Sequence, residues 1–493
     1  MKKYILLKEI ISYINPWFLA ILSGCLAILC FPPYYFSYLA YLFLIPLLFS
    51  FQGKNLFYLF FLGALQGLVF SLGLLYWIKI FHILAIPFLC LYFSLFMGIF
   101  GVLHGLTRDK LPKINFLLIP ILWILIEDFR SNGILGFPWG VIGYSQSRNT
   151  TLIQLADITG VLGISFIVII INVLIFEVFS KKPKKIYLLL IPLIFFLLIT
   201  YGKIRLKKDF IDKRDLKISI IQANINPDWY DTWHSHRSKV LKDLVLKTKE
   251  AATKHPDLII WTETALHDFW ETNQEIRPQV LKLAKECQVN LLIGIPHIEF
   301  GNQGNNKYFN SAFLISKEGK VIGRYDKVHL VPFGEMIPFE DFFVKLKNIF
   351  PFIPSVRNLL PKSGDFSRGE GFNPLSLCIN SNKKVRFGVL VCFEGIFGDI
   401  ARSFIKNKAN FIINITNDAW SKNISSHFQH FEILIFRAIE NRCFLVRAGN
   451  SGISAIINPY GKIEKSLGVH KRGILTGKIS TKTNKTFYNR YRY

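Results

Sequence analysis

The 493-residue sequence predicts two fold classes in one chain: a multi-span α-helical membrane domain over residues 1–202 and an α/β domain over residues 203–475. A basic C-terminal tail over residues 476–493 follows. Three observations support this division. Hydrophobic residues make up 51% of the chain although its net charge is +26. Charged residues are scarce before residue 203 and dense after it, and strand-like and helical segments alternate only in the second part.

The composition excludes several classes of protein. Residues 1–202 hold 14 Lys and Arg against 6 Asp and Glu, whereas residues 203–493 hold 45 against 27. Such an apolar chain buries enough surface to fold, which excludes intrinsic disorder. Seven cysteines in a chain of this length are too few for a disulfide-stapled scaffold. The first part therefore has the composition of a membrane domain, and the second has the charge density of a soluble domain.

Apolar runs recur through the first part at spacings that suit membrane helices, which need roughly 20 apolar residues each. We expect about seven spans, at Pro16–Phe31, Tyr38–Phe51, Leu56–Trp77, Ile83–Val102, Ile114–Ile126, Val161–Phe179 and Ile186–Tyr201. A cleaved signal peptide is an alternative interpretation of the first run. We reject it because the leader is long and mixed and no small-residue cleavage site follows.

Lys and Arg in the loops between spans predict the orientation. One side would hold Lys2, Lys3, Lys8, Lys54, Arg108, Lys110, Lys113, Lys181, Lys182, Lys184 and Lys185, and the other only Lys79, Arg130 and Arg148. With the basic side in the cytoplasm, an odd number of spans places the second domain outside. For a bacterium this predicts a multi-pass inner-membrane protein whose second domain is periplasmic; a cytoplasmic second domain is the alternative.

The second domain alternates strand-like and helical runs, which favours an α/β layered fold. Expected strands are Leu216–Gln222, Asp257–Trp261, Asn290–Pro296, Asn310–Ser316, Val385–Cys392, Phe411–Asn414, Phe444–Ala448 and Ser454–Asn458. Expected helices are Ser238–Lys254, Glu275–Cys287 and Ser426–Asn441. In such folds the reactive side chains lie just past the carboxyl ends of strands.

Three reactive side chains occupy such positions. Glu263 follows an apolar strand, Lys327 lies in the segment GRYDKVHLVPFGE, and Cys392 ends the strand VRFGVLVC. A thiol is mostly protonated at neutral pH, so a nucleophilic Cys needs a base and charge stabilisation. A carboxylate, a Lys and a Cys are the groups needed for acyl transfer through a thioester.

Each of these residues also has an ordinary structural interpretation. A Cys at the end of a buried strand usually acts as a small hydrophobic residue. Glu263 is placed to support a helix N-terminus, and Lys327 is one cation among many. The functional interpretation therefore depends on the combination of the three residues.

That combination resembles a known family. WTETA at 261–265, YDKVHLVPFGE at 325–335 and CFE at 392–394 look like the Glu-Lys-Cys triad of the nitrilase superfamily. The membrane half narrows the resemblance to the bacterial apolipoprotein N-acyltransferases. Segments of both halves carry it: FPPYYFSYLAYLFLIPLL at 31–48, GLLYWI at 73–78, GFPWGVIGYSQ at 136–146, LIQLADITGVLGISF at 152–166, IQANI at 221–225, NDAW at 417–420 and RAGNSGISAIINPYG at 447–461.

The resemblance implies a nitrilase-like α-β-β-α sandwich for the second domain. It also implies that Cys392 is the nucleophile, that Glu263 is the general base and that Lys327 stabilises the oxyanion. Glu335 and Glu394 fall on further important acidic positions of the family and would orient Lys327 and the base.

The implied reaction moves an acyl chain from a membrane phospholipid, through a thioester, to the α-amine of an apolipoprotein's N-terminal S-diacylglyceryl cysteine. This would be the last step of lipoprotein maturation, with ping-pong kinetics. No metal or other cofactor is called for, and we expect a monomer.

Several positions depart from the family pattern. Phe393 follows the nucleophile where the family usually has Tyr. Trp229 and Trp233 both compete for the position of the substrate-site Trp, and neither spacing fits. Trp420 is a candidate for contact with acyl chains, with core packing as the alternative. The family usually ends in one more membrane helix, whereas TFYNRYRY predicts a carboxyl end on the membrane surface.

Three other functions are compatible with parts of the sequence. A membrane-tethered amidase or nitrilase would use the same triad to hydrolyse a small amide or nitrile. A non-catalytic membrane scaffold or transporter is disfavoured because the spans hold almost no charge. Nucleic-acid binding is disfavoured because the basic residues are dispersed in a domain predicted to lie outside the cytoplasm.

Overall fold

The structure is a computed structural model. It describes residues 14–80, 85–179, 186–207, 215–229, 232–340, 366–380, 383–421, 423–481 and 485–491. Contacts between Cα atoms divide the chain into two units, residues 1–208 and residues 209–493. Seven of the lysines used above for the orientation lie outside the described residues: Lys2, Lys3, Lys8, Lys181, Lys182, Lys184 and Lys185.

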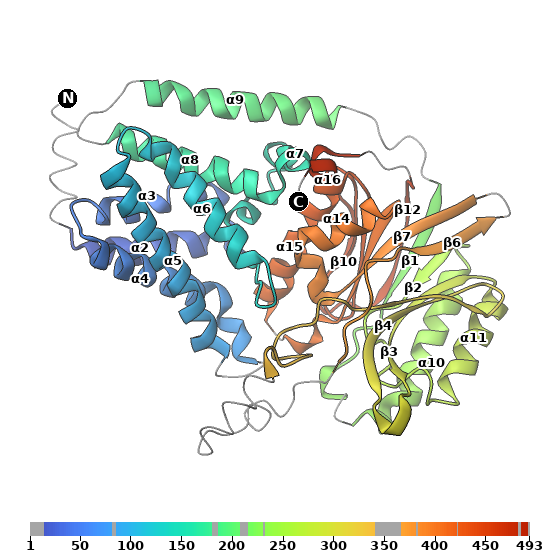
Figure 1. The fold of residues 1–493 in the computed structure, drawn as a ribbon. Coiled ribbons are helices and arrows are strands. Elements are labelled where there is room, and N and C mark those ends of the chain that lie inside the picture. The colour runs from blue at the N-terminus through green and yellow to red at the C-terminus, as the bar shows by residue number, and fades with distance from the viewer. Residues whose placement is uncertain are drawn as a thin grey trace, which may run out of the picture. The chain divides into compact units, whose positions relative to one another are not determined.

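The first unit is helical (Figure 1). Its main helices are α2 (Pro16–Leu29), α3 (Leu44–Ser50), α4 (Leu56–Leu75), α5 (Ala85–Lys110), α6 (Asn115–Ser131), α7 (Ala156–Thr159), α8 (Val161–Val178) and α9 (Ile186–Leu206). Among the described residues, four helices are long and apolar enough to cross a membrane: Leu56–Lys79, Ala85–Lys110, Val161–Val178 and Ile186–Leu206. The remaining predicted runs coincide with shorter helices, so the number of about seven spans stays a prediction.

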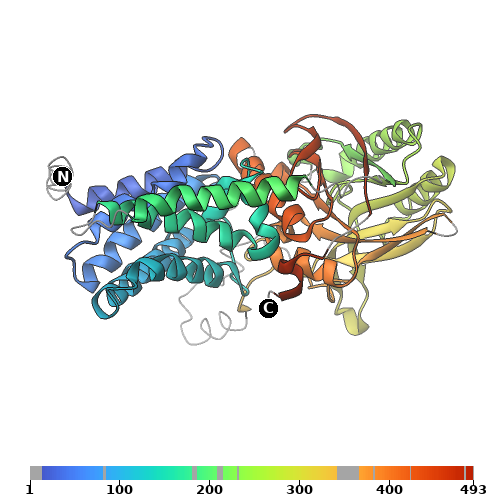
Figure 2. The same cartoon turned by 90° about the horizontal axis from the view of Figure 1, so that it is seen from above.

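Small residues let α4 and α5 pack closely. A Cβ atom added to Gly63 would lie 2.2 Å from the carbonyl oxygen of Met97, and one added to Gly101 would lie 2.2 Å from that of Leu59. A larger side chain at either position would push the two backbones apart. Close approach through small residues is how helices associate where water supplies no hydrophobic driving force. Figure 2 shows α8 and α9 of the same unit running side by side.

Polar side chains of α6 hold the long loop that follows this helix. The Glu127 carboxylate accepts the backbone N–H of Ile142 at 2.7 Å. The Arg130 guanidinium donates to the carbonyl oxygens of Phe137 and Trp139 at 2.6 and 2.8 Å. Both charged side chains are buried. These three loop backbone groups are therefore satisfied by side chains of the helical unit, as polar backbone groups in an apolar environment must be.

The second unit holds two six-stranded sheets, in the orders β12-β1-β2-β3-β4-β5 and β11-β10-β9-β8-β7-β6. Figure 1 shows the two sheets face to face, with α10 (Trp233–Ala252) and α11 (Ile276–Cys287) outside one and α14 (Gly398–Lys406) and α15 (Ile424–Asn441) outside the other. This is the α-β-β-α sandwich that the family resemblance implies. Strands β1, β2 and β3 are parallel neighbours, as are β7, β8 and β9.

All eight expected strands are present within a few residues of their predicted bounds: β1 (Leu216–Gln222), β2 (Leu258–Ile260), β3 (Asn290–Glu299), β4 (Lys307–Ile315), β7 (Lys383–Val391), β8 (Phe411–Thr416), β9 (Leu445–Gly449) and β10 (Ser454–Ile457). The sequence did not predict the other four: β5 (Val321–Asp326), β6 (Leu375–Asn380), β11 (Ile463–Leu467) and β12 (Gly473–Ile479). These four are the edge strands of the two sheets.

The end of the chain packs on the second unit. Strand β12 pairs antiparallel with β1, so the boundary expected after residue 475 falls within a strand. The short helix α16 (Phe487–Tyr491) packs against α14 and α15. The Tyr488 side chain is buried, and the Thr486 hydroxyl donates to the Glu440 carbonyl oxygen at 2.7 Å.

Candidate active site

Cys392 lies at a sharp turn after β7. Its φ of +50° is in the left-handed region, which costs a residue other than Gly roughly 1–2 kcal/mol. A short 3₁₀ helix begins at the same residue, Cys392–Ile396. The Asn414 side-chain amide braces the turn by donating to the carbonyl oxygens of Leu390 and Cys392, at 3.0 and 3.4 Å. The left-handed backbone therefore ends β7 just before the residue that carries the thiol.

Lys327 follows β5 and is fully buried. Its ammonium nitrogen lies 2.8 and 2.9 Å from the two carboxylate oxygens of Glu335, and 3.9 Å from Glu263 Oε1. Burial alone would lower the pKa of Lys327, but the carboxylates of Glu335 and Glu263 outweigh it and raise the pKa. Lys327 is therefore a fixed cation at neutral pH.

Glu263 follows β2 and is also buried. One carboxylate oxygen accepts the Asn310 amide at 2.8 Å, and the other accepts the backbone N–H of Asn417 at 2.7 Å. Gly294 in β3 makes room for this segment, because a Cβ atom there would lie 2.6 Å from the Glu263 Cα. Burial raises the pKa of Glu263, and the neighbouring Lys327 opposes that rise. A carboxylate with a raised pKa is a better proton acceptor than one in water.

The electrostatics around the thiol call for such a base. Burial raises the pKa of Cys392, the negative charge of Glu263 raises it further, and the cation of Lys327 opposes both. Cys392 is thus a neutral thiol at rest, with the Glu263 carboxylate and the Lys327 ammonium group nearby. The structure brings together the three residues selected from the sequence, and their catalytic roles stay a prediction.

Glu335 and Asn310 support the base and the cation. Glu335 is held in turn by the backbone N–H of Val331, which donates to it at 2.9 Å. The Asn310 side-chain nitrogen donates to Glu263 and to Glu335 at 2.8 and 2.9 Å, and the Asn310 backbone carbonyl oxygen accepts the backbone N–H of Lys327. Glu335 contacts the Lys327 ammonium group, and its expected role of orienting Lys327 stays a prediction. The sequence did not predict that Asn310 belongs to the site, although Asn310 is a polar residue within a buried, mostly apolar strand.

Glu394 joins two segments of the site through their backbones. One carboxylate oxygen accepts the N–H groups of Val328 and His329 at 2.8 and 3.0 Å and the Tyr325 hydroxyl at 2.9 Å. The other accepts the N–H of Val391 at 2.8 Å. Glu394 thereby ties the segment around Lys327 to the strand that precedes Cys392. Burial raises the pKa of Glu394 to about 7.

The aromatic residues selected from the sequence lie in different surroundings. Phe393 is buried, with its ring 5.2 Å from that of Phe397. Trp233 begins α10, and its indole N–H donates to the Asp268 carboxylate at 2.6 Å, in the loop that follows Glu263. Trp229 is half-buried and stacks on the His236 ring at 4.6 Å. Trp420 is half-buried. Contact of these four side chains with substrate stays a prediction.

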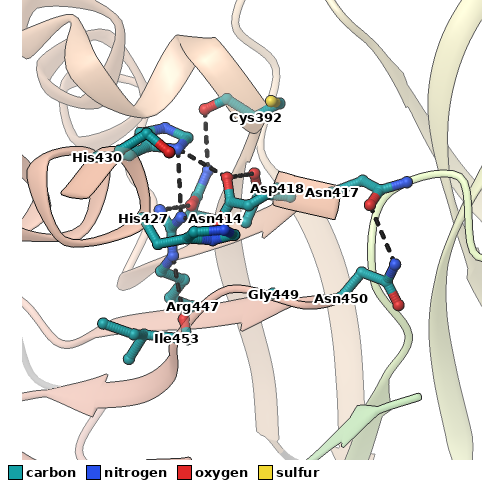
Figure 3. A network of polar contacts seen from close by, with 12 residues as sticks. Cys392, Asn414, Asn417, Asp418, His427, His430, Arg447, Gly449, Asn450 and Ile453 are labelled. Atoms are coloured by element: carbon teal, nitrogen blue, oxygen red, sulfur yellow. Dashed lines mark hydrogen bonds and ion pairs between the residues drawn. The ribbon is translucent and has the colours of Figure 1, made fainter. Parts of the chain in front are cut away.

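A buried polar network lies behind the nucleophile turn (Figure 3). The Arg447 guanidinium donates to the Asp418 carboxylate at 2.6 Å and to the side-chain oxygen Oδ1 of Asn414 at 3.0 Å. His430 of α15 contacts the other Asp418 oxygen at 2.9 Å. The Asn450 amide donates to the Asn417 side chain at 3.1 Å. Asp418 and Arg447 stand in family motifs of the sequence. Asn414 and His430 carry no sequence signal, because long-range contacts leave no periodic pattern.

In the part of the chain that the structure describes, no group of three His, Cys, Asp or Glu side chains is placed to hold a metal ion. All seven cysteines are described, and all are free thiols. The expected absence of a cofactor stays a prediction.

Comparison with known families matches both halves of the chain. The carbon-nitrogen hydrolase family matches residues 217–487, and the apolipoprotein N-acyltransferase N-terminal domain matches residues 23–174.

Individual proteins match over most of the length. The apolipoprotein N-acyltransferase of Geobacter metallireducens is 35% identical, over 96% of this chain and 91% of the relative. That of Rickettsia prowazekii is 32% identical, over 87% of this chain and 85% of the relative. Among solved structures, an amidase from Nesterenkonia sp. is 18% identical with a TM-score of 0.40, over 57% of this chain and 96% of the amidase.

Proposed function

Because the chain belongs to the apolipoprotein N-acyltransferase family, we propose that it N-acylates the N-terminal S-diacylglyceryl cysteine of apolipoproteins with an acyl chain from a phospholipid. This would be the last step of lipoprotein maturation. The observation that carries the proposal is the convergence of Glu263, Lys327 and Cys392 in a chain related to these acyltransferases over both of its halves.

In the first half-reaction, Glu263 takes the proton of the Cys392 thiol as the sulfur attacks the ester carbonyl of the phospholipid. The carbonyl oxygen gains negative charge in the tetrahedral intermediate, and the Lys327 ammonium stabilises that charge. The intermediate collapses to a thioester. The lysophospholipid leaves as an alcohol after Glu263 returns the proton to its oxygen.

In the second half-reaction, the α-amine of the apolipoprotein attacks the thioester carbonyl. Glu263 accepts a proton from the attacking nitrogen, and Lys327 again faces the oxyanion. The C–S bond breaks, Cys392 regains its proton and the product is an amide. The two half-reactions share one acyl-enzyme, so the kinetics are ping-pong.

The setting of the reaction is part of the same proposal. We propose a multi-pass protein of the bacterial inner membrane with its catalytic domain on the periplasmic side, acting as a monomer without nucleic acid. The distribution of loop Lys and Arg supports the orientation. The four apolar helices support residence in a membrane, where both lipid substrates are found.

Intact mass spectrometry of the purified full-length protein tests the proposal. After incubation with phospholipid, we expect an acyl adduct on Cys392 that disappears when a diacylated lipopeptide is added. Cys392→Ala should form no adduct and no N-acylated lipopeptide. Cys378→Ala is the matched control, because Cys378 is an exposed thiol in the same unit, on β6.

The outcomes separate the alternatives. Transfer of the acyl chain to the lipopeptide amine supports the acyltransferase. Release of free fatty acid alone, or hydrolysis of a small amide, would point to a membrane-tethered amidase. N-acylation that survives in Cys392→Ala would exclude the thioester mechanism and leave a non-catalytic role for the thiol.

A further inference from the structure

Thr416 ends the strand next to the nucleophile. Strands β7 and β8 are parallel, with Val391 opposite Ile415. One residue further along each strand places Cys392 beside Thr416. Thr416 is fully buried beside Cys392, and its hydroxyl lowers the pKa of the Cys392 thiol. The Thr416 hydroxyl is thus a neutral hydrogen-bonding group at the sulfur.

The same hydroxyl contacts a buried carboxylate. Thr416 Oγ1 donates to Asp418 Oδ1 at 3.2 Å. Asp418 is held by Arg447 at 2.6 Å and by His430 at 2.9 Å (Figure 3). Burial works against the charged form of Asp418, but Arg447 and His430 outweigh it and hold the pKa of Asp418 well below its usual value. Asp418 is therefore a fixed acceptor that keeps the hydroxyl oxygen of Thr416 in place.

The charges that face Cys392 come from three segments. Glu263 follows β2, Lys327 follows β5 and Asp418 follows β8, and His430 from α15 contacts the backbone of Cys392. Two anions oppose the formation of a thiolate, whereas one cation favours it. A neutral hydroxyl beside the sulfur that can donate a hydrogen bond to it favours the thiolate without adding a charge to the site.

We propose that Thr416 is a positioning residue that stabilises the thiolate of Cys392 by donating its hydroxyl proton to the sulfur. While Cys392 is a thiol, that proton points to Asp418. When Glu263 removes the thiol proton, the hydroxyl turns toward the sulfur, and Asp418 keeps its hydrogen bonds from Arg447 and His430. No proton leaves Thr416. The inference rests on the proposed role of Cys392 as nucleophile.

The rate at which iodoacetamide alkylates Cys392 measures the fraction of Cys392 that is present as thiolate. The rates are measured on the full-length protein in detergent at about pH 8, by peptide mass spectrometry of the Cys392 peptide. At a pH below the thiol pKa, this rate is proportional to the thiolate fraction. Thr416→Val keeps the shape of the side chain and removes the hydroxyl, and Thr416→Ala removes it in a second way. We expect both variants to alkylate roughly tenfold more slowly and to load acyl chains more slowly by a similar factor.

Two controls distinguish positioning from a general effect on folding. Thr416→Ser keeps the hydroxyl and should restore alkylation to within about twofold of the wild type. Thr476→Val removes a hydroxyl that hydrogen-bonds with Ser219 at 2.8 Å in the other sheet, and should leave alkylation unchanged. The thermal unfolding midpoint of each variant confirms that it is folded, and either hydroxyl-free variant that folds decides the test.

The inference is overturned if the hydroxyl-free variants alkylate at the wild-type rate, or if Thr416→Ser slows alkylation as much as Thr416→Val does. Alkylation requires no acyl donor. A slower alkylation in a protein that proves unable to transfer acyl chains would therefore support the role of Thr416 and refute the proposed function.

Discussion

The buried carboxyl group of Glu394 predicts a measurable dependence of stability on pH. Its pKa is about 7 in the folded protein and 4.5 for an ordinary glutamate. Between these pH values the folded state holds a proton that the unfolded state has lost. The resulting stability is fully present below pH 4.5 and is lost as the pH rises through 7. A shift of this size corresponds to about 3 kcal/mol.

The perturbation is Glu394→Gln, which keeps the shape of the side chain and removes its titration. The glutamine amide loses at least one of the four hydrogen bonds that the carboxylate accepts. That loss is a constant cost of about 1–3 kcal/mol. The pH-dependent part is separate from it. Between about pH 4.5 and pH 8, the free energy of unfolding of the wild type should fall by about 3 kcal/mol more than that of Glu394→Gln.

Denaturant unfolding of the full-length protein in detergent, at several pH values, measures this difference. Glu286→Gln is the matched control, because Glu286 is exposed and makes only long surface ion pairs with Lys249 and Lys282, at 3.8 and 3.6 Å. Such pairs contribute little, so this variant should follow the wild type. If Glu394→Gln shows the wild-type pH dependence to within about 1 kcal/mol, the assignment of this titration to Glu394 is wrong.

Two further predictions concern the surroundings of the nucleophile. Lys327→Met removes the cation between Glu335 and Glu263. We expect this variant to lose about 3–5 kcal/mol of unfolding free energy in denaturant unfolding and to load acyl chains at least about 100-fold more slowly. A stability equal to that of the wild type would contradict the ion pairing. Gly452→Ala would place a Cβ atom 2.0 Å from the Asp418 carboxylate, so we expect slower alkylation of Cys392, whereas Gly468→Ala, where the nearest side-chain atom lies 3.9 Å away, should match the wild type.

The sequence predicted the inner strands of both sheets and missed all four edge strands. The inner strands are buried on both faces and read as continuous apolar runs. Strands β5 and β11 are largely exposed, with polar residues such as Arg324 and Lys465 among them. An edge strand needs only one partner and no apolar run, so hydrophobic patterning did not reveal it. Only the hydrogen-bonded register identified these four segments as strands.

The reactive residues were predictable because the topology of an α/β fold places them. Glu263 and Cys392 each follow a buried parallel strand, and Lys327 stands in a family motif. Their supporting residues were less accessible to sequence reasoning. Glu394 was selected as an acidic position, but its role of tying together two backbone segments required the structure.

The sequence by itself determined the division into an apolar helical part and a charged α/β part, the inner strands of the sandwich and the candidate residues for nucleophile, base and cation. These features are local, since they follow from apolar periodicity and from the residues at strand ends. Only the tertiary structure decided which groups hold those side chains in place. Glu263 and the Asn417 N–H that binds it are 154 residues apart, and Arg447, Asp418 and His430 meet from a strand, a loop and a helix. Such contacts depend on how the sheets and helices pack, which no local pattern in the sequence records.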